Sequence, residues 1–476
     1  MISLRRVFVR LLVAGVLSSM PLHEAAAAEP SDPYFSSKGS WAQNHDDQWA
    51  IKRVGFTNDR ESAWGLIGNS PKAVVVAVVD TGLDWNHRDI DWERIWHNED
   101  EIPDNGVDDD GNGYIDDIIG WDFWRNNNKP WDRDGHGTFV AGLIAATRNN
   151  GIGIAGLNPH ARIMVLKAMN SFGHTRVSYV TKAILYAADN GADIVNLSLG
   201  GKGLSRTAQM AIDYARKKGV LIVVAAGNEG ISTDEFGPAG AEHVLTVAAT
   251  GPGDERANFS NWGKAVKIAA PGVDVLSLRA RRTDMMLAIP GMEYEPEESF
   301  VGKDRRYYHA EGTSFAAPFV TAVASLLLSK NPELTAEQIE RMIVHSAEDI
   351  GAPGVDQLTG YGLLNARAAL IADPAFFVEA RITGVAVIQE DGKHVAQVDG
   401  VANADKFEEA WLELGAGEEP KKWKKVGGTL KTPVGQGMLG EVDSKNFAGS
   451  KVWSLRIRVK HKNGTERESR FTLTLG

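Results

Sequence analysis

Four polar side chains in this sequence are of the types that perform nucleophilic catalysis, and each is flanked by glycine or other small residues. Asp80 ends VAVVD, His136 lies in DGHGTFVAG, Asn228 lies in AAGNEG and Ser314 lies in GTSFAAP. An imidazole can remove the proton of a serine hydroxyl near neutral pH, and a carboxylate can orient that imidazole. A carboxamide can donate a hydrogen bond to the oxyanion that then forms. We therefore expect a serine nucleophile, a histidine base, an orienting aspartate and an asparagine that stabilises the oxyanion.

Each of these residues, taken alone, also has a simpler explanation. Asp and Asn are common in turns, and Ser314 could be the N-cap of an apolar helix expected over Phe315–Leu328. Pro318 is expected in the first turn of that helix, where its missing N–H has little cost. The same helix N-terminus leaves backbone N–H groups unpaired, so we expect the Ser314 N–H to be a second oxyanion donor. Because all four residues end apolar segments, the catalytic explanation is the better one.

The elements that would hold these residues alternate between short apolar segments and helical patterns, from Pro71 to about Pro374. The expected strands are Lys72–Val79, Ala192–Leu199, Val220–Ala226, Val244–Ala249 and Val266–Ala270. The expected helices are Thr138–Ala146, Val177–Asn190, Ser205–Lys218 and Thr335–Ser346. Strands that are apolar throughout are typical of a parallel sheet covered on both faces. The pattern predicts an α/β fold with a doubly wound parallel sheet, whose sites form at the carboxyl ends of its strands.

The motifs DTGLD, HGTFVAG and GTSFAAP, in this order, strongly resemble those of the subtilisin-like serine proteases (subtilases). The resemblance covers roughly Asp32–Ala372. It implies a subtilisin-like fold and hydrolysis of peptide bonds in proteins or peptides, by the triad named above with Asn228 in the oxyanion hole. It also implies that Ser198, Leu199 and Gly200, within the segment NLSLGG, pair as a strand with extended substrate.

Two functions of other classes compete with this interpretation. A catalytically idle binding protein would have its carboxyl-terminal domain as the working part, and an intact set of catalytic residue types disfavours it. A serine esterase would show G-x-S-x-G around Ser314, and GTSFA lacks that pattern. The sequence therefore favours a serine endopeptidase.

The acidic segment Asp104–Asp117, DNGVDDDGNGYIDD, is a candidate calcium loop. Its oxygen-bearing residues and its glycine follow the spacing of the first half of an EF-hand loop. The expected ligands are Asp108, Asp110, Asn112 and the Tyr114 carbonyl, completed by Asp116 or Asp117. No glutamate occupies the twelfth position, so the match is partial and the alternative is a solvated acidic loop. We expect a structural calcium ion here.

A second calcium site is implied by the resemblance alone. Thermitase-like subtilases begin with a segment similar to SDPYFSS, Ser31–Ser37, which implies calcium binding by Asp32. The matching positions also imply Asp89, Asn150 and the carbonyls of Arg148, Ile152 and Ile154. The alternative is that Asn149–Gly151 is an ordinary turn.

The amino-terminal segment and the composition indicate where the protein acts. Met1–Ala28 has the basic start, short apolar run and small-residue end of an export signal, and that run is short for a bilayer span. The 476-residue chain has no cysteine, which excludes disulfides and a thiol nucleophile. Its formal net charge is −11, and loss of the signal's three arginines and one glutamate would make it more negative. We expect a secreted monomer, extracellular or periplasmic, with no nucleic-acid partner and no membrane span.

The residues after Asp373-Pro374 have a different pattern. Alternating segments separated by the turn signals Asp391-Gly392 and Asn463-Gly464 predict a C-terminal antiparallel β-sandwich without catalytic motifs. The expected strands are Ala380–Gln389, His394–Val398, Phe407–Leu414, Ser454–Val459 and Arg470–Leu475. We therefore divide the chain into a signal peptide (1–28), a catalytic domain (29–373) and a β-sandwich domain (374–476).

Two features depart from the resemblance. The interval between the export signal and Asp32 has no room for the inhibitory pro-domain that many relatives carry. The charged stretch Arg279–His309 is longer than its counterpart in relatives, which indicates either an insertion near the active site or a solvated loop.

Overall fold

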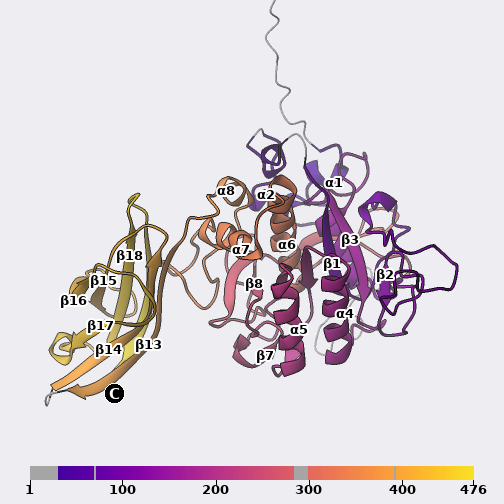
Figure 1. Cartoon of the computed structure of the whole chain (residues 1–476). Coiled ribbons are helices and arrows are strands. Elements are labelled where there is room, and N and C mark those ends of the chain that lie inside the picture. Colours follow the sequence, from indigo (N-terminus) through magenta and orange to yellow (C-terminus); the bar gives the residue numbers. More distant parts are fainter. Residues whose placement is uncertain (1–29, 60, 69–70, 284–298, 391–392, 476) are drawn as a thin grey trace, which may run out of the picture.

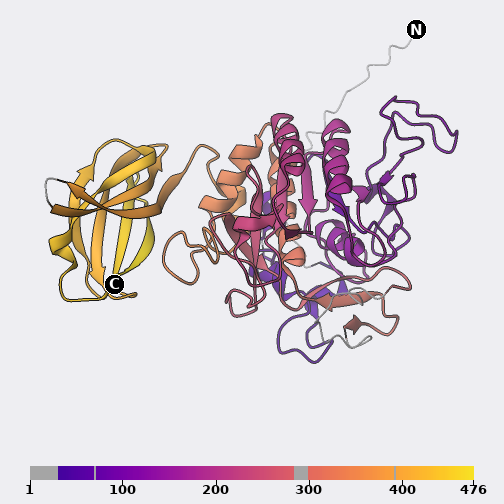
Figure 2. The ribbon, with the colours of Figure 1, turned by 90° about the horizontal axis from the view of Figure 1, so that it is seen from below.

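A computed structural model describes residues 30–475 apart from 60, 69–70, 284–298 and 391–392. The export signal and the Asp391-Gly392 turn lie outside the described residues. The described chain has a larger α/β part and a smaller β-sandwich at one end of it (Figure 1). The acidic segment Asp104–Asp117 projects at the end of the molecule opposite the sandwich (Figure 2).

The larger part is built on a seven-stranded sheet in which all neighbouring strands are parallel. Its order is β2 (Gly120–Asp122), β3 (Ala161–Lys167), β1 (Val74–Asp80), β4 (Ile194–Leu197), β6 (Leu221–Ala225), β8 (Leu245–Thr250) and β9 (Val266–Pro271). This confirms the predicted doubly wound sheet and its five predicted strands. The prediction omitted β2, which has three residues, and β3, whose apolar run is interrupted by Arg162 and ends in Lys167.

Helices cover both faces of this sheet. One face carries α3 (His136–Ala145), α6 (Thr313–Lys330), α7 (Ala336–His345) and α8 (Ala366–Ile371), and the other carries α4 (Val177–Asp189) and α5 (Arg206–Lys217). Strand β1 has apolar side chains on both faces. Val76 and Val78 belong to the same hydrophobic core as α3, α6, α7 and α8, whereas Ala77 and Val79 belong to the core that contains α4 and α5. A strand whose two faces are both buried must be apolar at every position.

The helix α6 begins two residues before the predicted Phe315, because Gly312 is its N-cap. Pro318 is therefore the sixth residue of the helix, and the prediction that it lies in the first turn is wrong. Without an N–H, Pro318 cannot donate to the carbonyl of the residue four positions earlier, which is Ser314. Although α6 is apolar and long enough to cross a membrane by composition, 83% of it is buried inside the protein.

The remaining elements of the larger part are short. They are α1 (Pro33–Ser36), α2 (Trp49–Arg53), η1 (Ala63–Leu66), η2 (Trp92–Arg94), η3 (Thr233–Glu235), the paired strands β5 (Gly201–Lys202) and β7 (Phe236–Gly237), and β10 (Val275–Leu278), β11 (Phe300–Val301) and β12 (Tyr307–Ala310). The last three form an antiparallel sheet in the order β10-β12-β11. Part of the charged stretch Arg279–His309 thus forms strands β11 and β12, and β12 leads directly to α6.

The C-terminal residues form the predicted antiparallel β-sandwich. One sheet contains β13 (Val378–Glu390), β14 (Lys393–Ala404) and β17 (Val434–Asp443), and the other contains β16 (Lys424–Leu430), β15 (Phe407–Ala416), β18 (Val452–His461) and β19 (Glu466–Thr474), with η4 (Ser444–Phe447) after β17. Their inward side chains form a separate core. Arg467 donates to the His345 carbonyl (2.9 Å) and the Ser469 hydroxyl to the Val355 carbonyl (3.3 Å), so the sandwich contacts the end of α7 and the loop after it.

The contact between the turn after β1 and the start of α3 leaves no room for a side chain. A Cβ atom on Gly137 would lie 2.3 Å from the Gly82 carbonyl oxygen and 3.2 Å from the Asp80 Cβ. Gly137→Ala should therefore lower the free energy of unfolding by at least about 1–3 kcal/mol, as overpacking of a tight interior does. Chemical denaturation would measure this loss. Gly435→Ala is the matched control, because its Cβ would meet nothing within 4 Å, and equal stabilities of the two variants would contradict the prediction.

Candidate active site

Three of the predicted catalytic residues stand at the ends of buried elements. Asp80 is the last residue of β1, His136 the first residue of α3 and Ser314 the second residue of α6. The imidazole Nδ1 of His136 lies 2.8 Å from Asp80 Oδ1 and 3.0 Å from Asp80 Oδ2. The Asp80 side chain is fully buried, whereas 11% of the His136 side chain is exposed. Because the carboxylate occupies Nδ1, the other ring nitrogen is the one that can act as a base.

The Asp80 carboxylate is held by the turn that follows it. The Thr81 N–H donates to Asp80 Oδ1 (2.7 Å), and the Thr81 hydroxyl donates to Asp132 Oδ1 (2.9 Å). The Gly137 N–H donates to the same hydroxyl (2.8 Å) and so ties the turn to the start of α3. Asp132, a buried residue of the loop that leads into His136, also accepts from the Thr138 N–H (2.9 Å). These bonds fix the positions of Asp80 and His136 relative to one another.

The charges around His136 favour its cationic form. Burial alone would lower the pKa of the imidazole, but the Asp80 carboxylate, with two further aspartates nearby, outweighs burial and raises the pKa to about 9. Burial, together with the neighbouring Asp132, raises the pKa of Asp134 to about 7. The imidazolium that a serine hydrolase forms during acyl transfer is therefore stabilised here. The neutral base becomes the major form only at alkaline pH.

The helix α6 and the residues after β4 hold Ser314 by reciprocal hydrogen bonds. The Ser314 hydroxyl donates to the Ser198 carbonyl (3.2 Å), and the Ser198 hydroxyl donates to the Ser314 carbonyl (2.7 Å) that Pro318 leaves without a helical donor. Asn196 Nδ2 donates to the Ser198 hydroxyl (2.9 Å). Phe315, fully buried, places its ring 5.4 Å from the His136 ring, so the residue that follows Ser314 packs beside the imidazole.

The Asn228 carboxamide has one end fixed. Its Oδ1 accepts from the Thr313 N–H and from the Thr313 hydroxyl, both at 2.8 Å. These two donors assign the oxygen, and Nδ2 makes no hydrogen bond within the described residues, so its N–H groups are available. The Ser314 N–H, at the second helical position, has no acceptor among the described residues. The Asn228 amide and the Ser314 N–H are thus two donors of the kind that can stabilise an oxyanion.

A cavity of 720 Å³ begins at the predicted substrate strand. Leu199 and Gly200 line it, together with apolar residues of α4 and α5 and the segment from Gly201 to Arg206. Ser198, which contacts Ser314, directly precedes Leu199 in the chain. A peptide that lay along this strand could place an apolar side chain in the cavity.

Lys167 is a residue of this site that the sequence analysis missed. It ends β3, beside Asp80 of β1 and Asp122 of β2 in the strand pairing, and its side chain is buried. Its ammonium group donates to the Thr81 carbonyl, on the turn that holds Asp80. Burial lowers the pKa of Lys167, while the carboxylates around it, Asp132 first, act in the opposite direction. A buried lysine that ends a strand next to acidic residues is the signal that could have identified it.

The acidic segment brings together some of its predicted calcium ligands. Oxygens of Glu101, Asp110 and Asp117 lie within 4.8 Å of one another, and Asn112 Nδ2 donates to both aspartates. Tyr186 of α4 donates its hydroxyl to Asp117, which fastens the segment to the sheet layer. Glu101 was not predicted. Carboxylate oxygens at this separation fit a cation with oxygen ligands at 2.3–2.6 Å.

Other predicted ligands of the same segment have different contacts. The Asp108 carboxylate accepts from the N–H groups of Asn112 (3.1 Å) and Gly113 (2.9 Å). The Asp116 carboxylate accepts from the N–H groups of Asn105 and Gly106, both at 3.0 Å. The Tyr114 ring packs against Tyr186, 5.0 Å away, and the Tyr114 carbonyl, which was the predicted ligand, accepts no hydrogen bond within the described residues. Asp108 and Asp116 thus support the loop's backbone in this structure.

The residues of the second predicted calcium site also converge. Asp32 and Asp89 are fully buried, Asn150 Nδ2 donates to Asp89 (2.7 Å), and the Asn150 N–H donates to Asp32 (3.3 Å). Burial, with Asp32 nearby, raises the pKa of Asp89 to about 6. The carbonyls of Arg148, Ile152 and Ile154 accept no hydrogen bond within the part of the chain that the structure describes. Two buried carboxylates beside three unpaired carbonyls fit a hard cation.

Known proteins are similar to this chain in sequence and in fold. The profile of the subtilase family of peptidases matches residues 71–362. A thermophilic serine proteinase of Bacillus sp. (strain AK1) is 34% identical over 75% of this chain and 75% of its own length. Thermitase of Thermoactinomyces vulgaris is 31% identical over 68% of this chain and 94% of its own. A solved protease of Pseudoalteromonas arctica PAMC 21717, 27% identical, covers 72% of this chain and 99% of its own with a TM-score of 0.54. The chain therefore belongs to the subtilase family and is a serine endopeptidase.

Proposed function

We propose that this endopeptidase cleaves peptide bonds through Asp80, His136 and Ser314, with Asn228 as an oxyanion donor. The observation that carries the proposal is the buried Asp80–His136 pair (2.8 Å), whose imidazole is adjacent to the residue following Ser314. Family membership supports the reaction class, and the geometry supports the assignment of roles to these residues.

The reaction would proceed in two acyl-transfer steps. The substrate displaces the Ser314 hydroxyl from the Ser198 carbonyl, and His136 removes the hydroxyl proton as Oγ attacks the scissile carbonyl. The Ser314 N–H and Asn228 Nδ2 donate to the resulting oxyanion. Asp80 holds the imidazolium, which then protonates the leaving amine. A water molecule repeats the sequence against the acyl-enzyme and regenerates the free hydroxyl.

We assign substrate binding to the segment Ser198–Gly200, which directly follows β4, and to the apolar cavity beside it. Extended peptide would pair with this segment by main-chain hydrogen bonds, and the cavity would select an apolar side chain of that peptide. The lining by Val177, Val180 and Ile212 supports that preference.

We assign a stabilising role to calcium at the two clusters described above. At one, Glu101, Asp110 and Asp117 would hold the ion with help from Asn112. At the other, Asp32, Asp89 and Asn150 would do so with the three loop carbonyls. The fit of the oxygens supports both assignments. Because the chain has no cysteine, metal would be the available cross-link for these loops.

We further propose that the protein is exported by residues 1–28 and acts as a soluble monomer outside the cytoplasm. The sequence pattern of these residues supports the export step. We place the boundary between the catalytic and sandwich domains near residue 373, where the last helix of the larger part has just ended and the first sandwich strand begins five residues later.

The first prediction that tests the proposed function concerns the nucleophile. Ser314→Ala should abolish hydrolysis of a peptide substrate, because no other group can form the acyl-enzyme. The fold should persist, since the lost hydroxyl makes one 3.2 Å hydrogen bond, worth about 1 kcal/mol. Substrate turnover and thermal unfolding measure the two effects. Turnover near the wild-type rate in the Ala variant would refute the assignment.

The second prediction concerns Lys167 as a positioning residue. Lys167→Met keeps the stem but removes the ammonium group from the Thr81 turn, so kcat/KM should fall about ten- to a hundredfold, mainly through kcat. His136 must be neutral to act as base, so activity should rise with pH toward its pKa of about 9. Loss of the Lys167 cation should favour the imidazolium further. The inflection of the pH–rate profile that reports the His136 pKa should therefore move to higher pH.

The pH–rate profile distinguishes positioning from mere support of the fold. Lys182→Met, a loss of one exposed lysine on α4, is the control and should leave the inflection in place. A Lys167→Met enzyme that is less stable but has the wild-type inflection and kcat would contradict the positioning role.

The third prediction concerns calcium. Chelation should lower the melting temperature, and an excess of calcium a hundredfold above Kd should restore about 2.7 kcal/mol per site. Asp110→Asn should weaken this response, because the ion loses a charged ligand. Asp109→Asn, whose carboxylate accepts instead from Ile102 and Asn105, is the matched control. If the two variants respond to calcium like the wild type, the acidic segment is only a solvated loop.

A further inference from the structure

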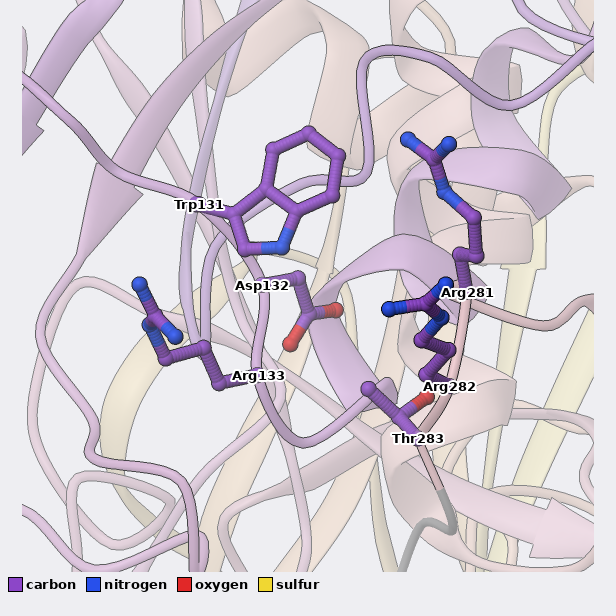
Figure 3. A pocket seen from close by; sticks show the side chains of 6 residues that line it. All are labelled: Trp131, Asp132, Arg133, Arg281, Arg282 and Thr283. Atoms are coloured by element: carbon purple, nitrogen blue, oxygen red, sulfur yellow. The ribbon is translucent and has the colours of Figure 1, made fainter.

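A second hollow, of 490 Å³, lies beside the loop that leads into His136. Its lining residues are Trp131, Asp132, Arg133, Arg281, Arg282 and Thr283. Figure 3 shows Arg133 on one side of Asp132, and Arg281 and Arg282 on the other. We call this site the arginine hollow. It has no lining residue in common with the apolar cavity beside Ser198–Gly200.

Within the described residues, few carboxylates pair with the guanidinium groups of the arginine hollow. Arg133 and Arg282 are exposed and have no ion pair within the described part of the chain. Arg281 approaches Asp84 only at 3.9 Å, and 47% of its side chain is exposed. Among the described residues of the lining, Asp132 is the one carboxylate; it is fully buried and already accepts hydrogen bonds from several groups around it. The hollow is therefore a positive site on a chain whose formal net charge is −11.

Both walls of the arginine hollow are anchored to the element that carries His136. Residues 131–133 belong to the loop that ends at His136. The Arg281 N–H donates to Asp84 Oδ2 (2.8 Å), and the Asp84 N–H donates to the hydroxyl of Thr138, two residues after His136 (2.9 Å). On the same segment as Arg281, the Ser277 hydroxyl donates to the Phe139 carbonyl on α3 (2.7 Å). The hollow therefore adjoins the loop and the helix that carry His136.

The chemistry of this site favours an anion. Guanidinium groups bind carboxylates and phosphates by paired, charge-assisted hydrogen bonds. Arg281 is 5.7 Å from the Trp131 ring centre, a cation–π contact that limits the freedom of its side chain. An acidic enzyme repels acidic substrates at long range, so a local positive site changes which of them can dock.

We propose that the arginine hollow binds an Asp or Glu side chain of the polypeptide being cleaved. The site makes the enzyme selective for an acidic residue near the scissile bond, at a position different from the one that occupies the apolar cavity. This inference rests on the proposed cleavage at His136 and Ser314.

The test uses matched peptides that differ by a single Glu or Gln, placed in turn at each position on both sides of one cleavage site. The full-length enzyme should show a higher kcat/KM for the Glu peptide, about five- to tenfold, at one or two positions only. The ratio of kcat/KM for the Glu peptide to that for the Gln peptide should decrease as salt is added, because the site is partly exposed. In the double variant Arg133→Gln/Arg282→Gln the ratio should fall to about one. Arg125→Gln, a loss of an exposed arginine outside the hollow, should keep it.

Equal cleavage of Glu and Gln peptides at every position, or a ratio that survives in the double variant, would overturn the inference. In a separate experiment, the melting temperature is measured with and without inorganic phosphate at constant ionic strength. A phosphate-dependent rise in melting temperature without any Glu preference would show an anion site that does not serve substrate, and would also overturn it. If the Gln peptides are cleaved and this cleavage depends on Ser314, the proposed function stands even when the hollow shows no preference for Glu. If no peptide is cleaved, the proposed function itself fails.

Discussion

The buried carboxylate of Asp80 is the constraint on which the rest of the catalytic domain depends. A charge with no access to water must be matched by donors at fixed positions, and here they are the Thr81 N–H and the His136 imidazole. Lys167 adds a cation by bonding the Thr81 carbonyl from the neighbouring strand. The close approach of Gly137 to the Gly82 carbonyl follows from the same requirement, because α3 must begin directly above the end of β1. The sheet supplies the geometry, since the parallel strands β1 and β3 end at one edge.

The proposed nucleophile is positioned by a second arrangement. Ser314 and Ser198 exchange hydrogen bonds, and the second of these is possible because Pro318 leaves a helical carbonyl unpaired. In the free enzyme, the Ser314 hydroxyl therefore points to the strand assigned to substrate, and a bound peptide would release it toward His136. Substrate binding at Ser198 would therefore also free the Ser314 hydroxyl for activation by His136. Asn228, fixed by Thr313, needs no such rearrangement.

Much of this could be predicted from the sequence, for reasons that the structure makes plain. Strands such as β1 are buried on both faces, so their apolar pattern is continuous, and the motif residues stand where those strands end. Lys167 was missed because β3 contains charged residues, and Glu101 because it joins Asp110 and Asp117 only through the fold of the loop. The strands β16 and β17 were missed because their glycines weaken the alternating pattern. The error at Pro318 arose from a helix start that depends on the conformation of Gly312, which the sequence alone does not define.

The most direct test of the account is to map the site of covalent labelling by a serine-directed peptidyl phosphonate. The reagent reacts only with a serine that a neighbouring base activates, so its position reports the nucleophile without reference to turnover. Mass spectrometry of the digested adduct should find one label per chain, on Ser314, and labelling should disappear in His136→Ala. Stoichiometric labelling of a different residue, or undiminished labelling without His136, would contradict the claim that this histidine, held by Asp80, activates Ser314.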